Sequence, residues 1–489
     1  MLTASPPQTD APKDPSGDLI KADLCIIGAG PAGIALAANA AACGQSVVLV
    51  EKHRMGGTSL NYGTVPSMAL AAAGETAAAF RGSGAHGIKP LEPTVEWAHV
   101  GARIRDAVAG MAPNFSAERL GGLGVRVIHA AGRFADQKTL MAGEHRVEAR
   151  RYVVATGSSP LLPNIRGVKD VAVFTTDTIF ENREPVDHLI IIGAGASGTQ
   201  LAQAFRRLGS RVTLIDQSQM LGRFDHELAD VVRIALTAEG VVIYENARVD
   251  AVAGVGSRIA VEGLFNGEPA RVEGSHVLIA CGRRPAVADL GLDLAKVAVT
   301  AEGIKTDGRL RSTNRRVYAI GDATGHPQSV QRAEYHARLL SASLVLGKPR
   351  KLNANGVPIA LYTDPELAMV GLTEAQSRKA FGRVEVHRFP MRENVRAMSM
   401  RAQLGHVKVT TDRRGRILGA GIAAKSAAEL IQVWALAISK GLTLDDMSGW
   451  IAPHPTLGEI NRNAAVHRYA EMTRFAAQRA WGRVLARLQ

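Results

Sequence analysis

The feature that most constrains this chain is a glycine-rich turn set between a strand and a helix. An apolar segment at 23–28 runs directly into the turn GAGPAG at 28–33, and a helix is predicted over 34–42. A second apolar segment follows and ends in an acid, Glu51. Strand, turn, helix and strand in this order form a βαβ unit, so we expect a parallel sheet with helices packed on it.

Each residue type in this turn has a physical role. Gly28 permits the tight turn, Gly30 lets the backbone approach a pyrophosphate, and Gly33 lets the helix pack closely on the strand. The N-terminus of the helix offers free N–H groups to a phosphate, and Glu51 can accept hydrogen bonds from a ribose diol. The unit therefore predicts a dinucleotide site rather than an ordinary glycine-rich loop.

The same pattern occurs a second time along the chain. The apolar segment 188–193 leads into GAGASG at 193–198, a helix is predicted to about Leu208, and the following strand ends at Asp216. Two such units predict two dinucleotides in one protein. The Asp216 carboxylate would bind an unphosphorylated ribose and repel a 2′-phosphate, which favours NADH over NADPH. Arginines near this acid leave NADPH open as the weaker alternative.

Composition sets the remaining bounds. A length of 489 residues exceeds one ordinary core, so two to four domains are expected, and 46% hydrophobic with 21% charged residues is typical of globular chains. The first 20 residues lack an apolar core, which indicates a mobile tail rather than a secretory signal. Cys25, Cys43 and Cys281 have no paired spacing, which argues against a disulfide framework or a metal site and favours the cytoplasm. The net charge of +13 is interpreted as a generally basic surface, with no nucleic-acid partner expected.

Five further motifs occur in the order and spacing of a known family. They are Ala155-Thr156-Gly157, Cys281-Gly282-Arg283-Arg284-Pro285, VYAIGDA at 317–323, TDPE at 363–366 with VGLT at 370–373, and His454-Pro455-Thr456 followed by Glu459. In these motifs the chain resembles the pyridine nucleotide–disulfide oxidoreductase family, which includes glutathione reductase, lipoamide dehydrogenase, mercuric reductase and soluble transhydrogenase. The resemblance covers residues 21 to about 466.

The resemblance implies an α/β fold with two Rossmann-like dinucleotide-binding domains and a C-terminal α+β dimerisation domain. It also implies an obligate homodimer, in which the His–Glu pair serves the active site of the opposite subunit. The expected division is an N-terminal tail at 1–20, an FAD-binding domain at 21–157, an NAD(P)-binding domain at 158–282, a central segment at 283–352 that completes the FAD domain, a dimerisation domain at 353–466 and a basic helix at 467–489.

The resemblance further implies which residues bind the cofactors. Asp322 is expected to bind the ribityl chain of FAD. The whole expected cofactor-binding set is Gly28, Gly30, Pro31, Gly33, Glu51, Lys52, Gly57, Thr58, Gly132, Thr156, Gly157, Arg283, Gly321, Asp322, Ala323, Gly193, Gly195, Gly198, Asp216 and Gly282.

The chain departs from the family where a redox-active cysteine pair is expected. Ser59 and Thr64 stand at the two positions in the segment GGTSLNYGT at 56–64. A hydroxyl cannot form a disulfide and is not an anionic nucleophile at neutral pH, so dithiol chemistry is not expected at this site. His454 and Glu459 are retained as an acid–base pair, and with Ser59 and Thr64 they form the predicted catalytic set.

Three more positions depart from the family. Met68 and Gln200 replace a lysine–glutamate pair, and the joint loss of two opposite charges leaves the expected flavin pocket neutral. Ala196 stands where several members have a tyrosine that covers the flavin. The nicotinamide side of the pocket is therefore expected to differ from that of other members.

These observations favour an FAD-dependent NADH oxidoreductase without a redox disulfide, with a quinone or another small acceptor and His454 as proton donor. A soluble pyridine nucleotide transhydrogenase is the first alternative, which Asp216 disfavours. A flavin dehydrogenase or oxidase, or a non-catalytic flavoprotein, that does not use nicotinamide is the other. The C-terminal segment 461–489 has six arginines and one acid on an amphipathic pattern, which fits packing on its own dimer or a peripheral membrane contact.

Overall fold

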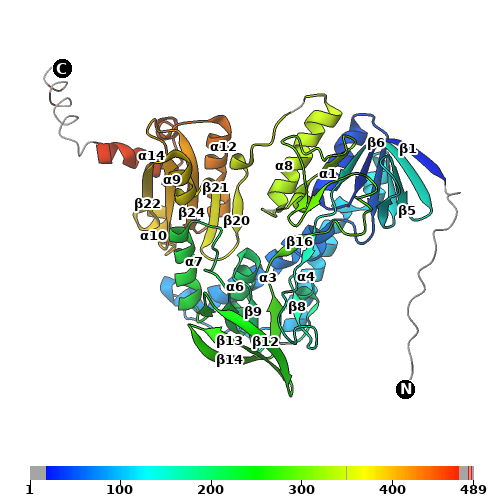
Figure 1. Ribbon diagram of the computed structural model, residues 1–489. Coiled ribbons are helices and arrows are strands. Elements are labelled where there is room, and N and C mark those ends of the chain that lie inside the picture. The colour runs from blue at the N-terminus through cyan, green and yellow to red at the C-terminus, as the bar shows by residue number, and fades with distance from the viewer. Residues whose placement is uncertain (1–17, 326, 349, 473–482, 484–485, 487–489) are drawn as a thin grey trace.

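The chain folds into three lobes, which Figure 1 shows side by side. The computed structural model describes residues 18–325, 327–348 and 350–472, together with Arg483 and Ala486. Most of the predicted tail at 1–20 and of the predicted basic helix at 467–489 therefore lies outside the described residues. The first strand begins at Leu19, two residues inside the predicted tail, because Ile20 is buried in the sheet beside Val147.

The first lobe contains a seven-stranded sheet in the order β3-β2-β1-β6-β5-β4, with β19 also paired to β6. Strands β1, β2, β3, β6 and β19 are parallel, whereas β4 and β5 are antiparallel. The bounds are β1 Leu19–Ile27, β2 Val47–Glu51, β3 Val125–His129, β4 Gly132–Phe134, β5 Thr139–Ala142, β6 His145–Val154 and β19 Val317–Ala319. Every residue of β2 is buried, as expected for a strand covered on both faces.

Two helices pack together on this sheet, α1 (Pro31–Ala42) and α8 (Val330–Leu340). Helix α1 begins three residues before the predicted start, because Pro31 has a backbone φ suited to the first helical position and needs no hydrogen bond there. Helix α8 comes from the far side of the sequence, so the first lobe is completed by a segment that follows the second lobe.

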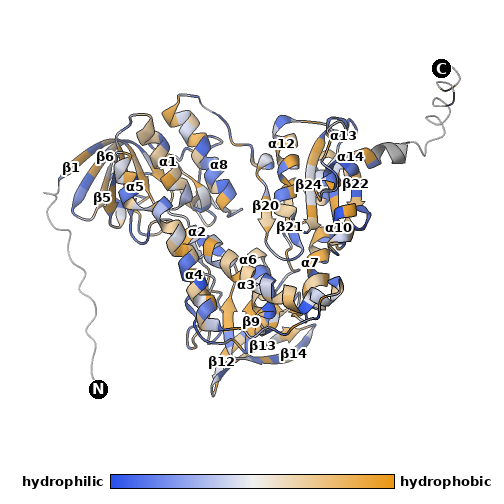
Figure 2. Cartoon of the chain, turned by 180° about the vertical axis from the view of Figure 1, so that it is seen from behind, coloured by the Kyte–Doolittle hydropathy of each residue, from blue (hydrophilic) through white to orange (hydrophobic). Residues whose placement is uncertain are grey.

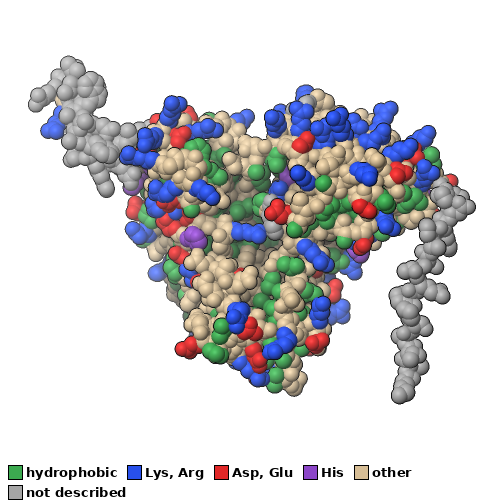
Figure 3. All heavy atoms as spheres, in the orientation of Figure 1, with side chains coloured by type: hydrophobic (Ala, Val, Ile, Leu, Met, Phe, Trp, Pro, Cys, Tyr) green, Lys and Arg blue, Asp and Glu red, His purple; other side chains and the backbone are tan. Residues whose placement is uncertain are grey.

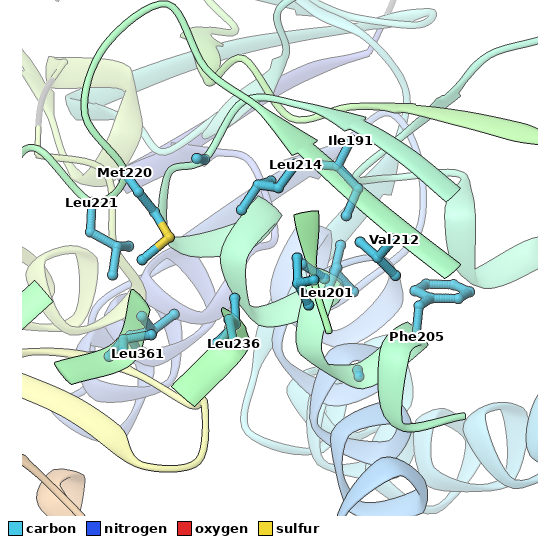
Figure 4. Close-up of a cluster of buried hydrophobic side chains, with 14 of the residues drawn as sticks. Ile191, Leu201, Phe205, Val212, Leu214, Met220, Leu221, Leu236 and Leu361 are labelled. Carbon is cyan, nitrogen blue, oxygen red and sulfur yellow. The ribbon is translucent and has the colours of Figure 1, made fainter. Parts of the chain in front are cut away.

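The second lobe contains a parallel sheet in the order β11-β10-β9-β15-β8. Its elements are β8 Phe174–Thr175, β9 His188–Ile192, α6 Ala196–Arg207, β10 Arg211–Ile215, α7 His226–Ala238, β11 Val242–Tyr244 and β15 His276–Ile279. An antiparallel sheet of β12 (Arg248–Val255), β13 (Arg258–Phe265) and β14 (Glu268–Gly274) adjoins it. Figure 4 shows Leu201 and Phe205 of α6 packed beside Val212 of β10, and this contact holds the helix over the sheet.

The chain crosses between these two lobes twice. Strand β7 (Ser158–Pro160) carries it out of the first lobe, and β16 (Arg283–Pro285) brings it back. The two crossings pair with each other in antiparallel register. The second lobe is therefore inserted into the first, as the resemblance implies, while the exact boundaries at 157/158 and 282/283 stay predictions.

The third lobe contains an antiparallel sheet in the order β20-β21-β24-β23-β22. Its elements are β20 Ile359–Leu361, β21 Glu366–Gly371, α9 Glu374–Phe381, β22 Glu385–Pro390, α10 Val395–Ser399, β23 His406–Thr411, β24 Ile417–Ala424, α11 Ala427–Leu430, α12 Gln432–Lys440, α13 Leu444–Ser448 and α14 Glu459–Met472. The buried indole N–H of Trp434 donates a 2.7 Å hydrogen bond to Asn461 and fixes α12 against α14.

The lobes meet through packed helices rather than through loops alone. Helix α3 (Thr64–Gly82) of the first lobe packs against α6, and a side chain at Gly74 would stand 3.2 Å from the Ala204 carbonyl oxygen.

Hydrophobic residues run along β9 in the middle of the second lobe, whereas the outer helix α8 is largely hydrophilic (Figure 2). Among the described residues, no helix has the length and apolar character needed to cross a membrane.

Candidate functional site

The first glycine-rich turn joins β1 to α1 in the geometry that the sequence predicts. Gly28 has a φ of +111°, and a side chain there would stand 2.4 Å from the Ala155 carbonyl oxygen. A side chain at Gly33 would stand 2.1 Å from the Gly28 carbonyl oxygen. The Glu51 carboxylate accepts a hydrogen bond from the Ala29 N–H at 2.6 Å. Glycine is therefore required at two positions by backbone packing.

The second turn, between β9 and α6, repeats this geometry. Gly193 has a φ of +112°, and a side chain there would stand 2.4 Å from the Ala280 carbonyl oxygen. Asp216 accepts a hydrogen bond from the Ala194 N–H at 2.6 Å, as Glu51 does in the first turn. The other Asp216 oxygen accepts hydrogen bonds from the backbone N–H and the hydroxyl of Ser218, both at 2.8 Å.

One glycine in each turn has open space in front of it. A side chain at Gly30 or at Gly195 would meet nothing within 4 Å. Neither residue has a positive φ, so the absence of a side chain is not required by the backbone. Space at the N-terminus of a helix, with N–H groups directed into it, is what a dinucleotide pyrophosphate needs. Both turns therefore fit the phosphates that the sequence predicts.

Other polar groups at the first turn also fit a bound cofactor. In the described part of the chain, the hydroxyl of Thr156 is buried without a hydrogen-bond partner. Its backbone nitrogen would stand 3.0 Å from a side chain at Gly28, so this hydroxyl lies beside the first turn. Buried polar groups are rarely left unpaired, and a ligand that reaches this turn could supply the missing partner. Gly157, the next residue, has open space in front of it.

A short helix, α2 (Gly57–Asn61), lies against the first turn. A side chain at Gly57 would stand 3.0 Å from the Gly30 Cα, and the N–H of Gly56 donates to the Ala29 carbonyl at 2.8 Å. The following residue, Thr58, is thereby held near the predicted phosphate position. The structure brings these FAD-site candidates together, although they are about 27 positions apart in the sequence.

Ser59 of α2 and Thr64 at the start of α3 face each other. The Ser59 hydroxyl donates a hydrogen bond to the Thr64 hydroxyl at 3.3 Å. The two hydroxyl groups are therefore close enough to interact directly. The three cysteines of the sequence, Cys25, Cys43 and Cys281, are free and lie in other segments.

Arg283 links several predicted site residues in one network. Its guanidinium donates to the Asp177 carboxylate at 2.6 Å, to the Ser158 hydroxyl at 2.9 Å and to the Thr58 hydroxyl at 3.4 Å. The Ser158 hydroxyl donates in turn to Asp322 at 2.7 Å. Thr58, Arg283 and Asp322, which lie in three distant motifs, are thus joined around one arginine.

A buried histidine supports the turn that contains Asp322. The N–H of Gly321 donates to the His336 Nδ1 at 3.2 Å, and Gly321 has a φ of +62°. Burial, with the nearby Arg332 charge, lowers the pKa of His336 to about 4, so the ring is neutral and can accept this bond. Ala323 is fully buried in the same turn.

The remaining candidates lie at the edges of the two turns. Gly132 packs against Ile27 and Val50, whereas Lys52 is exposed after β2. Gly282, with a φ of +106°, follows Cys281 at the second turn. Two further candidates for cofactor binding, Pro31 and Gly198, lie at the starts of α1 and α6.

The thiol of Cys281 lies at the second turn. It donates to the Ile192 carbonyl at 3.3 Å, and burial together with the nearby Asp216 charge raises its pKa to about 11. This thiol is therefore protonated at neutral pH and is a poor nucleophile.

The predicted acid–base pair lies in the third lobe. His454 Nδ1 and the Glu459 carboxylate are 2.9 Å apart, and the Thr456 N–H donates to the same carboxylate at 3.0 Å. The Thr456 N–H and then His454 lower the pKa of Glu459. The His454 side chain is 65% exposed. In Figure 1, α14, which begins at Glu459, lies on the side of the third lobe opposite to α1 and α8. Within the described residues, His454 forms no hydrogen bond or ion pair with Ser59 or Thr64.

Sequence reasoning missed three residues that Arg283 contacts: Ser158, Thr176 and Asp177. Ser158 lies one position beyond a predicted motif, and Thr176 and Asp177 lie in a loop after β8 that carries no motif. All three contact Arg283 across more than 100 positions, so only the folded chain places them together. Of the altered positions, Gln200 has a buried amide nitrogen without a partner among the described residues, and Met68 is 37% exposed.

Comparison with known proteins is consistent with this geometry. A mercuric reductase of Streptomyces lividans is 35% identical over 452 residues, which cover 91% of this chain and 95% of that protein. A dihydrolipoyl dehydrogenase of Bacillus subtilis is 33% identical over 463 residues, which cover 91% of this chain and 96% of that protein. The crystal structure of LpdA from Mycobacterium tuberculosis has a TM-score of 0.83 at 25% identity and covers 91% of this chain and 99% of its own.

The HOCl-induced flavoprotein disulfide reductase RclA of Escherichia coli has a TM-score of 0.81 at 26% identity, over 91% of this chain and 99% of its own. Residues 22–337 match the family described as pyridine nucleotide-disulphide oxidoreductase, whose members are FAD-dependent and bind NAD(P)H. Residues 357–465 match the dimerisation domain of that family, which supports a homodimer. The predicted family and fold class are confirmed, and the chain belongs to the pyridine nucleotide-disulphide oxidoreductase family.

Proposed function

We propose that the protein is an FAD-dependent NADH oxidoreductase that works without a redox disulfide and passes electrons to a non-disulfide acceptor such as a quinone. The observation that carries this proposal is the hydroxyl pair of Ser59 and Thr64, 3.3 Å apart at the α2–α3 turn. The resemblance places two cysteines at these positions in disulfide-using members. Two hydroxyls cannot store electrons as a thiol pair does, so a disulfide substrate has no partner for exchange there.

The first turn and the Arg283 network would hold FAD. Gly30 and Thr58 would contact its phosphates, and Asp322 would accept hydrogen bonds from its ribityl hydroxyls. When bound, FAD supplies the capacity to take a pair of electrons from reduced nicotinamide and to release them to an acceptor. Arg283 would keep a positive charge beside the phosphates while its bonds to Asp177 and Ser158 fix its direction.

The second turn would hold NADH. Gly195 has the open space that a pyrophosphate needs, and Asp216 lies at the end of β10 where the adenine ribose would reach it. The Asp216 carboxylate would accept hydrogen bonds from ribose hydroxyls and repel a 2′-phosphate. This charge supports NADH as the preferred nucleotide.

His454 would handle protons on the acceptor side. Glu459 holds its Nδ1 at 2.9 Å, which orients the ring. Because His454 is exposed and the helix that follows it, α14, lies on the side of the third lobe opposite to α1, it would serve the site of the second subunit. There it would donate a proton to a reduced acceptor such as a quinone.

The test is anaerobic reduction of the purified holoprotein. We expect NADH to bleach the flavin absorbance faster than NADPH does, and one pair of electrons per flavin to complete the reduction. A family member with a working disulfide takes up a second pair. Added quinone should restore the absorbance, whereas lipoamide or glutathione disulfide should not. Uptake of a second electron pair, or turnover with either disulfide, would contradict the proposal.

A double variant, Ser59→Cys with Thr64→Cys, is the matched comparison. Its thiols would occupy the positions of the present hydroxyls, so it should take up the second electron pair that the native protein lacks. Single variants at either position are the controls, because one thiol cannot close a disulfide. If neither nucleotide reduces the native flavin, the nicotinamide part of the proposal is wrong.

A further inference from the structure

Five basic side chains gather on the first lobe at some distance along the chain from the glycine-rich turns. They are Arg309, Arg338, Lys348, Arg350 and Lys351, and together we call them the basic face. All five are exposed. Figure 3 shows lysine and arginine side chains concentrated over the top of the lobe that carries α8.

Backbone contacts hold the three segments of the basic face together. The N–H of Leu352 donates to the Gly308 carbonyl at 2.8 Å, which joins the segment after Arg350 to the turn that contains Arg309. The N–H of Asn353 donates to the Tyr335 hydroxyl at 3.0 Å, which joins the same segment to α8. The basic face is thus a fixed surface rather than a set of unrelated side chains.

The cations of the basic face are not neutralised by ion pairs among the described residues, although Asp307 precedes Arg309 by two positions and Glu334 precedes Arg338 by four. Within the part of the chain that the structure describes, none of the five forms an ion pair, and the nearby Asp307 is engaged by Arg311 at 3.3 Å. Elsewhere arginines are commonly paired, as Arg271 is with Glu273 at 2.7 Å. Unpaired cations held close together repel one another, so an anionic surface would stabilise this arrangement.

An apolar residue lies beside these charges. Leu346 is 58% exposed and precedes Lys348 by two positions. The only tyrosine, tryptophan or phenylalanine between residues 335 and 353 is Tyr335. The Arg338 guanidinium lies 5.9 Å from the centre of the Tyr335 ring, and the Tyr335 hydroxyl accepts a hydrogen bond from the Asn353 N–H. Single-stranded nucleic acids are usually bound by exposed aromatic rings, whereas an exposed leucine among cations suits the headgroup layer of a membrane.

We propose that the basic face binds membranes rich in anionic lipid, with the five cations facing headgroup phosphates and Leu346 entering the interfacial layer. Each cation near an anionic membrane strengthens binding by roughly fivefold at moderate ionic strength. The proposal goes beyond the proposed oxidoreductase function and does not depend on which electron acceptor is used. Electrostatic attraction of this kind weakens as salt screens the charges.

The test is co-sedimentation of the full-length holoprotein with phosphatidylcholine vesicles that contain or lack phosphatidylglycerol. We expect binding to the anionic vesicles alone, lost in high salt. The triple variant Lys348→Gln, Arg350→Gln and Lys351→Gln should bind them roughly a hundredfold more weakly. Leu346→Ser should weaken binding several-fold without changing its salt dependence.

A charge-matched control removes three arginines from the second lobe: Arg248→Gln, Arg258→Gln and Arg271→Gln. These side chains are paired with acids on or beside the β12–β14 sheet, so vesicle binding should stay at the native level. All variants keep the arginine-rich C-terminal segment, so any contribution of that segment to vesicle binding is the same in each of them. Flavin absorbance and its reduction by NADH check that each variant is folded.

Three outcomes would overturn the proposal. The triple variant could bind anionic vesicles as well as the native protein, which would assign binding to another segment. The native protein could bind vesicles with and without phosphatidylglycerol equally. The native protein could also fail to bind either kind of vesicle but bind a single-stranded oligonucleotide that the triple variant does not bind. That result would make the basic face a nucleic-acid site.

Discussion

The glycines of the two turns separate into two physical classes. Gly28 and Gly193 are required by the backbone, because each has a positive φ and would bring a side chain within 2.4 Å of a carbonyl oxygen. Gly30 and Gly195 have open space in front of them instead. At these two positions the fold does not require glycine, as expected where a ligand approaches the backbone.

This distinction predicts different results for one substitution. Gly30→Ala should fold with native stability but retain FAD at least about tenfold less tightly, because its methyl group occupies the phosphate position. Gly195→Ala should keep its flavin and lose NADH binding to a similar extent. Flavin content after purification and the rate of flavin reduction by NADH measure the two effects.

Gly28→Ala is the contrasting control, since the added methyl collides with the Ala155 carbonyl oxygen and should lower stability whether FAD is present or not. If Gly30→Ala held FAD as tightly as the native protein, the phosphate would lie elsewhere. The assignment of the first turn to FAD would then be wrong.

Local pattern predicted the residues whose role depends on local geometry. The glycines, Glu51 and Asp216 lie within single βαβ units, so periodicity and spacing suffice to place them. Motifs of the family supplied Thr58, Arg283 and Asp322. The side chains that orient them, Ser158 and Asp177, depend on contacts between distant segments and carried no pattern of their own.

At the scale of elements, one buried lysine joins the second lobe to the third. Lys408 of β23 is 6% exposed, and its ammonium lies 2.9 Å from Asp225, 2.9 Å from Glu227 and 2.8 Å from Glu374. Hydrogen bonds to Glu374, Asp225 and Glu227 raise the pKa of Lys408 against the opposing effect of burial. Asp225 also caps α7, so the cluster fixes that helix to the third lobe.

Removing the lysine should therefore loosen this junction. Lys408→Met leaves Asp225 buried without its cation and should cost about 3 kcal/mol, the lower end for breaking a buried ion pair because Glu227 and Glu374 remain partly exposed. Amide exchange in α7 and β23 measures the opening of this junction. The double variant Lys408→Met with Asp225→Asn should recover part of the lost stability. Equal amide-exchange protection in Lys408→Met and in the native protein would show that Lys408 does not hold this junction together.

The same junction predicts a response to acid. The Arg388 hydrogen bonds and then Lys408 lower the pKa of Glu227 to about 2, below its value in an unfolded chain. Its contribution to stability is therefore present above about pH 4.5 and is lost as the pH falls toward 2. We expect the urea midpoint of the native protein to fall more steeply between about pH 5 and pH 3 than that of Glu227→Gln.

Asp225, Glu374 and the buried His406 ring beside Glu227 are present in both proteins, so the difference between the two curves isolates Glu227. Parallel curves would show that the ionised form of Glu227 contributes nothing to the stability of the folded protein. Neither Glu227 nor Lys408 belongs to a sequence motif. Periodicity predicted the strands and helices of the two βαβ units, but it did not predict this contact between lobes, because the contact joins residues more than 180 positions apart.

At the scale of the whole molecule, the proposed site draws on residues of different lobes. The glycine-rich turns, Ser59 and Thr64 belong to the first and second lobes, whereas His454 is exposed on the third. The match to a dimerisation domain supplies the second subunit that would bring them together. The α/β fold was predictable from the two βαβ units, whereas the proposed role of His454 at the opposite subunit rests on the resemblance.

A heterodimer tests this division directly. One subunit carries Gly195→Ala, which weakens NADH binding, and the other carries His454→Gln, with different affinity tags to purify the mixed dimer. The NADH concentration is kept low enough that the Gly195→Ala site stays largely empty. If His454 serves the opposite subunit, one of the two sites has intact NADH binding and an intact histidine, and the heterodimer should turn over at about half the native rate. If His454 serves its own subunit, each site carries one defect and quinone reduction should fall to the mean of the rates of the two variant homodimers. Flavin reduction by NADH, without quinone, should be half complete in either case, so that measurement reports correct assembly while quinone turnover alone decides where His454 acts.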